Sequence, residues 1–176
     1  MKIGRLNKDQ RGFSLLELVI VIALTGLITA AITTTVFQVF NMNTRTANRM
    51  TAVSQVQHAG KIVSEDILEA NTVDAEDDPY TPELELLTLT REDFATNATH
   101  EVIYTLDEGA LWRSESVEGE EGEIVTRVAE YIDPDQTTFD PPGVLPPGGV
   151  LTFTVTATVG DESETRTYEV QPRPGS

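Results

Sequence analysis

The chain of 176 residues contains no cysteine, which excludes a disulfide, a thiol nucleophile and a thiolate metal site. It contains two histidines, His58 and His100, and no phosphate-binding glycine loop, nucleophile elbow or metal-binding histidine pair. We interpret both histidines as solvated surface residues, the first on a helix and the second beside a strand. The sequence therefore predicts a protein that is not an enzyme.

Basic residues are scarce and unevenly placed. The formal net charge is −17, and Lys61 is the only lysine after Lys8. The first twelve residues hold four basic residues and one acidic residue, so the rest of the chain has a formal charge of −20. Such a surface repels nucleic acid, so we expect no nucleic-acid binding. The acidic surface suits a salty medium, because at 1 M salt charges are screened beyond ~3 Å and the self-repulsion is removed.

No proline precedes Pro79, and a long apolar run fills the N-terminal part of the chain. The run covers residues 13–40, whereas a helix of about 20 apolar residues suffices to cross a membrane. A secretory signal peptide would have an apolar region of only about 7–15 residues. Basic residues precede the run, and positive residues stay in the cytoplasm. We therefore predict a single pass through the cytoplasmic (inner) membrane, with the C-terminal part outside.

One acidic residue, Glu17, interrupts this run near its start. A charge at the centre of a membrane helix costs roughly 2.5–3.5 kcal/mol on insertion scales, so its presence indicates a function. The residues from Arg11 to Glu17 read Arg-Gly-Phe-Ser-Leu-Leu-Glu. This motif resembles the prepilin leader of type IV pilins and type II secretion pseudopilins, and the acid and the apolar run follow at matching spacing.

The resemblance implies that residues 1–12 form a leader peptide, which a prepilin peptidase removes between Gly12 and Phe13. The new amine of Phe13 is then N-methylated. Glu17 lies one helical turn beyond Phe13, and in a bundle of such helices its best partner is the ammonium group of a neighbouring subunit. Glu17 is therefore expected to form an assembly salt bridge, and no catalytic residue is expected. The implied partners are the peptidase, the membrane and other pilins or pseudopilins.

A stem helix is predicted over residues 41–72, after the membrane and assembly helix of residues 13–40. Small and apolar residues recur at steps of three and four, with polar residues between them, which indicates one packing face. The predicted face consists of Ala47, Met50, Val53, Val56, Gly60, Val63, Ile67 and Ala70. Asn71, Thr72 and an acidic stretch closed by Pro79 are expected to end the helix.

Residues 73–176 are predicted to form a β-rich globular domain outside the membrane, because the hydrophobic period changes to two. One hairpin is expected around Gly109, and a second joins the strand 151–159 to the strand 166–170 through Gly160. Further strands are expected at 84–89 and 124–132, and an irregular proline- and glycine-rich loop at 133–149. Three large aromatic residues on strands are expected in the core: Tyr104, Trp112 and Phe153.

The predicted fold class is α+β and pilin-like: a long N-terminal helix, first hydrophobic and then amphipathic, packed on a small, mainly antiparallel β-sheet domain. The order of the elements is similar to that of the larger minor pseudopilins, the J-type, and of related minor pilins. The resemblance implies a minor structural component of a type IV pilus or type II secretion pseudopilus. A membrane-tethered recognition module, which binds secreted substrates or surfaces, is the alternative.

Two acidic clusters raise the question of calcium, which prefers oxygen ligands. They are Asp74, Glu76, Asp77 and Asp78, and Glu118, Glu120, Glu121 and Glu123. Neither cluster has the spacing of a known calcium loop, and charge runs usually form solvated faces. The sequence therefore predicts no metal site and no cofactor, with calcium kept as an alternative.

Overall fold

The computed structural model describes residues 14–75, 84–93 and 98–173 of the chain. These residues form one long helix, α1 (Leu15–Glu69), and eight strands in two antiparallel sheets. The arrangement confirms the predicted α+β fold class. The chain divides into two compact units, residues 1–44 and 45–176, and each is described by itself.

The first unit contains the N-terminal part of α1. Its side chains are exposed at every described position from 14 to 44, although most of them are apolar. In the part of the chain that the structure describes, α1 is the one helix whose length and composition would allow it to cross a membrane. The apolar surface of this part of the helix is therefore available for lipid or for other helices.

The second unit contains both sheets. The first has the strand order β1–β2–β3–β4–β5, with the bounds β1 (Thr72–Asp74), β2 (Leu84–Asp93), β3 (Ala98–Asp107), β4 (Ala110–Val117) and β5 (Glu123–Ala129). The second has the order β6–β7–β8, with the bounds β6 (Thr138–Asp140), β7 (Leu151–Val159) and β8 (Glu162–Val170). All neighbouring strands are antiparallel, and the short helix η1 (Pro134–Gln136) precedes β6.

Both predicted hairpins are confirmed. β3 and β4 are joined at Glu108 and Gly109, whose φ angles are 46° and 77°. Two consecutive positive φ angles are the requirement of a type I′ turn, whose twist matches that of the flanking strands. β7 and β8 turn at Gly160, where φ is 59°.

Three features of the β-rich part differ from the expectation. Two sheets form where one small sheet was expected. The loop predicted to be irregular contains η1 and β6. In addition, an unexpected strand, β1, begins at Thr72, close to the end of α1 at Glu69. β1 and β6 have three residues each and depend on pairing with a longer strand, so they leave no periodic signal in the sequence.

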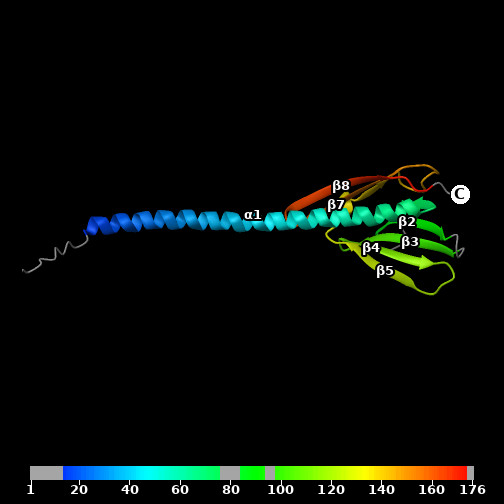
Figure 1. Cartoon of the computed structure of the whole chain (residues 1–176), viewed down its shortest axis with the longest axis horizontal. Coiled ribbons are helices and arrows are strands. Elements are labelled where there is room, and N and C mark those ends of the chain that lie inside the picture. The colour runs from blue at the N-terminus through cyan, green and yellow to red at the C-terminus, as the bar shows by residue number, and fades with distance from the viewer. Residues whose placement is uncertain (1–13, 76–83, 94–97, 174–176) are drawn as a thin grey trace, which may run out of the picture. The chain divides into compact units, whose positions relative to one another are not determined.

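The core of the second unit surrounds the C-terminal part of α1, which runs between the two sheets (Figure 1). The buried residues of this part are Ala52, Val56, Ala59, Gly60, Val63 and Ile67. The predicted packing face is therefore correct from Val56 onward and wrong at its start, where Ala47 and Met50 are exposed. Full burial begins at Ala52, after the half-buried Asn48 and Thr51. The β7–β8 turn already reaches Asn48, because a Cβ atom at Gly160 would lie 2.7 Å from its Nδ2.

Two of the three predicted core aromatics, Tyr104 and Phe153, are fully buried, whereas Trp112 is partly exposed. The ring of Phe153 stacks on Phe139 with a centroid separation of 4.6 Å and lies 6.2 Å from the ring of Tyr168. Trp112 follows the buried Leu111 on β4 and therefore projects from the opposite face, beside the exposed Arg127 of β5.

Gly60 allows β8 to approach α1 closely. A Cβ atom at this position would overlap the ring of Tyr168 on β8. The hydroxyl of Tyr168 donates a hydrogen bond of 3.1 Å to the carbonyl oxygen of Val56. The missing side chain of Gly60 therefore makes room for the aromatic ring that joins the second sheet to the helix.

Candidate functional site

The sequence predicts function mainly in the N-terminal segment. Gly12 and Phe13 lie outside the described residues. Glu17 lies in the first turn of α1, and its side chain is exposed. It is the only acidic residue between positions 14 and 64, and no basic side chain lies within four positions of it. Ion pairs along a helix join residues three or four positions apart, so no basic side chain of its own helix can pair with Glu17.

The threonines of the apolar segment satisfy their hydroxyl groups within the helix. Five threonine hydroxyls donate hydrogen bonds of 2.8–2.9 Å to the carbonyl four residues earlier: those of Thr25, Thr29, Thr33, Thr34 and Thr35. Unpaired polar groups are costly in hydrocarbon, so this pattern suits a lipid environment. Glu17 is then the one charged group in this part of α1.

A polar network joins α1 to the first sheet. Asp66 accepts hydrogen bonds of 2.6 Å from the hydroxyl of Tyr104 on β3 and from Nε of Arg113 on β4. Arg113 also pairs with Glu115 at 2.9 Å. Side chains from two strands thus converge on one partly buried carboxylate of α1, which fixes the helix against β3 and β4.

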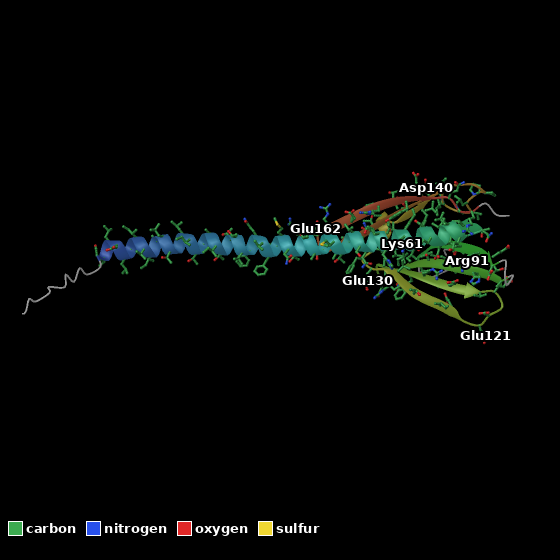
Figure 2. The ribbon with its side chains drawn as sticks, viewed as in Figure 1. Lys61, Arg91, Glu121, Glu130, Asp140 and Glu162 are labelled. Atoms are coloured by element: carbon green, nitrogen blue, oxygen red, sulfur yellow. The ribbon has the colours of Figure 1, made fainter. Side chains whose placement is uncertain are left out.

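The network continues through Glu115 to the end of the helix. Glu115 lies 3.1 Å from Nδ1 of His100 and 3.2 Å from Arg91. Arg91 in turn pairs with Glu69, the last residue of α1, and Figure 2 shows Arg91 beside this end of the helix. The prediction that His58 is solvated is confirmed, whereas that for His100 is wrong, because its ring is mostly covered and faces Glu115.

The environment shifts three pKa values in this network. Burial and the neighbouring carboxylate of Asp66 raise the pKa of Tyr104 far above its usual value. Burial opposes the charge of Arg113, but hydrogen bonds to Asp66 and Glu115 outweigh it and raise the pKa of Arg113. Burial would also raise the pKa of Glu115, but hydrogen bonds from Arg113 and His100 lower it. These groups keep their ordinary charge states at neutral pH, so the network acts as a structural clamp.

Sequence reasoning missed this network. Asp66 and Arg113 are 47 positions apart, so no local spacing connects them. The available signal was the position of each charge: Asp66 precedes the buried Ile67, and Arg113 lies two positions after the buried Leu111 on a strand. A charge beside a predicted core face requires a partner, but the sequence does not say which one.

Of the two acidic clusters, Glu76, Asp77 and Asp78 lie outside the described residues. The side chains of Glu118, Glu120, Glu121 and Glu123 are all exposed around the β4–β5 turn. Within the described residues, no group of three or more histidine, aspartate or glutamate side chains is arranged to hold a metal ion.

The N-terminal segment has a recognised counterpart among protein families. Residues 7–33 match the family model of the prokaryotic N-terminal methylation motif. Comparison with curated proteins and with solved structures gave no match. The matched segment includes Gly12, Phe13, Glu17 and the apolar start of α1. The match supports the resemblance to type IV pilins and pseudopilins, and together with the apolar N-terminal helix it supports a membrane-anchored, single-pass, pilin-like subunit.

Proposed function

We propose that the chain is a structural subunit of a type IV pilus or type II secretion pseudopilus. A prepilin peptidase cleaves it between Gly12 and Phe13, and the amine of Phe13 is methylated. The mature subunit resides in the cytoplasmic membrane with residues 73–176 outside, and it enters the filament through the N-terminal part of α1. Its role is that of a minor component, which initiates, caps or modulates the filament.

Glu17 carries this proposal. It is a single acid in an apolar helix, four residues beyond the proposed new N-terminus and within the matched methylation motif. A carboxylate in a low-dielectric bundle is strongly destabilising unless a cation pairs with it. The amine of Phe13 on a neighbouring subunit is that cation, so the pair sets the axial stagger between two helices. In this role Glu17 selects correctly positioned neighbours.

The assignment as a minor subunit rests on the element order and on α1 itself. The family's major pilins often have a proline within the membrane helix, and Thr34 lies near that place. The hydroxyl of Thr34 bonds to the carbonyl of Ala30, and the helix continues through this position. The missing proline at this place favours a minor subunit.

The test is the substitution Glu17→Ala in the native host, with filament formation as the readout. We expect the variant to be made, processed and retained in the membrane but absent from filaments. The matched control is Glu65→Ala, which removes an exposed acid of the same helix that forms an ion pair with Lys61. Normal incorporation of the Glu17→Ala subunit would contradict the proposed assembly role. Circular dichroism that shows a folded β-rich part would exclude misfolding as the reason for absence from filaments.

A further inference from the structure

The free edge of β5 is unusual for an edge strand. In the described part of the chain, β5 is the last strand of its sheet and pairs only with β4. The side chains at positions 123–127 are exposed on both faces, and those of Ile124 and Val125 are 67% and 57% exposed. Edge strands are usually protected by lysine, proline or bulges, because their free backbone groups pair with other strands. β5 instead presents the β-branched run Ile-Val-Thr.

The other sheet edges among the described residues are better protected. β1 and β6 have only three residues each. β8 has nine residues, but its sequence alternates with charges, at Glu162, Glu164, Arg166 and Glu169. β5 therefore combines a length of seven residues with an uncharged central run of Ile124, Val125 and Thr126, which is what an added strand requires.

A surface pocket of about 350 Å³ lies at the C-terminal end of β5. Arg127 of β5 pairs directly with Trp112 of β4, so both side chains project from one face of the sheet. The β3–β4 turn and the residues after β5 complete the wall. Its lining includes Asp107, Glu108, Trp112, Arg127, Glu130 and Tyr131.

The charges of this pocket favour a cation. Its one basic side chain, Arg127, already pairs with Glu130. Asp107 and Glu108 have no ion-pair partner within the described residues, and the ring of Trp112 forms part of the wall. Aromatic faces attract ammonium and guanidinium groups, and Trp does so most strongly. The pocket therefore has the chemistry to accept a lysine or arginine side chain.

Tyr131 adds a second aromatic ring at a conformational cost. Its φ is 62°, in the left-handed region, where a bulky residue is strained by about 1 kcal/mol or more. The backbone is held there because Ile132 donates a hydrogen bond to Gly109 and Thr158 donates one to Tyr131. Glycine would fit this conformation without strain, but it would leave the pocket without a half-exposed ring.

We propose that β5 binds an extended, positively charged segment of a partner protein by strand addition, with one lysine or arginine side chain in the adjacent pocket. Main-chain hydrogen bonds to the edge give affinity, and the pocket gives specificity. Acidic residues flank both ends of the edge, as Figure 2 shows for Glu121 and Glu130. A second copy of this chain is a poor partner, because its formal charge is −17 and its other long edge, β8, is acidic.

Fluorescence anisotropy with synthetic peptides tests the proposal on the full chain in neutral detergent micelles. The probe is an extended peptide of the length of β5 in which lysine alternates with threonine and valine. One control peptide replaces lysine by glutamate, and another keeps lysine but carries methyl groups on alternate backbone nitrogens. We expect only the unmethylated lysine peptide to bind, and more weakly at high salt. Absence of this binding, or equal binding of the methylated peptide, would overturn the proposal.

Paired variants then locate the binding surface. Val125→Lys places a repelling charge on the edge, and Val150→Lys makes the same change at an exposed valine before β7. Asp107→Asn with Glu108→Gln removes two charges from the β3–β4 turn. As a control, Asp161→Asn with Glu162→Gln removes two charges at the β7–β8 turn, so this variant has the same net charge as the Asp107→Asn, Glu108→Gln variant.

We expect each variant of the edge or the pocket to weaken binding about tenfold, which corresponds to about 1.4 kcal/mol, and each control to leave it nearly unchanged. If the test and control variants weakened binding equally, the binding would be nonspecific attraction to an acidic protein, and the assignment to β5 would be overturned. If a variant fails to fold, the comparison of methylated and unmethylated peptides on the unaltered chain still tests whether backbone hydrogen bonds to the edge are required.

Discussion

Replacement of Gly60 by alanine tests the contact between α1 and β8. In an exposed helix interior this change stabilises the helix by about 1 kcal/mol. Here the new methyl group would overlap the ring of Tyr168. Overpacking of this kind typically costs about 1–3 kcal/mol. Displacement of the ring also breaks the hydrogen bond from Tyr168 to the carbonyl of Val56, worth about 1 kcal/mol. We therefore expect Gly60→Ala to destabilise the fold by about 1–3 kcal/mol.

The assay is denaturant unfolding of the full chain in detergent, followed by near-ultraviolet circular dichroism. Gly26→Ala is the control, because a Cβ atom there would contact nothing within 4 Å, so this change should cause no loss of stability. In a Tyr168→Ala background, Gly60→Ala should lose most of its cost, because the overlapping ring is gone. If Gly60→Ala instead stabilised the fold by about 1 kcal/mol, the close approach of β8 to α1 would be refuted.

Three further predictions concern the charges. Arg113→Leu should destabilise the fold by about 3 kcal/mol in denaturant unfolding, because it removes the counter-charge of Asp66, whose side chain is only 16% exposed. The pKa of Glu115 is lowered in the folded state. Glu115 therefore stabilises the fold at pH values above its ordinary pKa of 4.5, and this stabilisation is lost as the pH falls below it. Glu115→Gln should therefore flatten the acid limb of the stability–pH curve, and an unchanged limb would contradict this. The thermal midpoint should rise between dilute buffer and molar salt, because screening weakens the repulsion of a chain with a formal charge of −17.

The sequence was most informative where local physics decides the structure. The turn at Gly109 requires positive φ angles, and the strand Leu151–Val159 alternates regularly, so both hairpins were predictable. The face of α1 from Val56 to Ile67 followed from its three- and four-residue steps. In each case the signal lies within a few residues.

Features that depend on distant partners were not predictable. β6 forms because Phe139 pairs with Phe153 on β7, and Met50 is exposed although its spacing matches the buried face of α1. The clamp at Asp66 requires Arg113, and the strained backbone at Tyr131 requires hydrogen bonds from both sheets. These outcomes follow from which elements meet in space, which local periodicity does not encode.

Processing at the prepilin motif is best tested by the mass of the intact protein. The protein is purified from native membranes, and its mass and N-terminal sequence are determined. We expect a chain that starts at Phe13 and is heavier by one methyl group. A chain that still starts at Met1 in cells able to process prepilins would contradict the cleavage and indicate an ordinary membrane anchor. A start near Ile32 would contradict it as well and indicate a secreted domain.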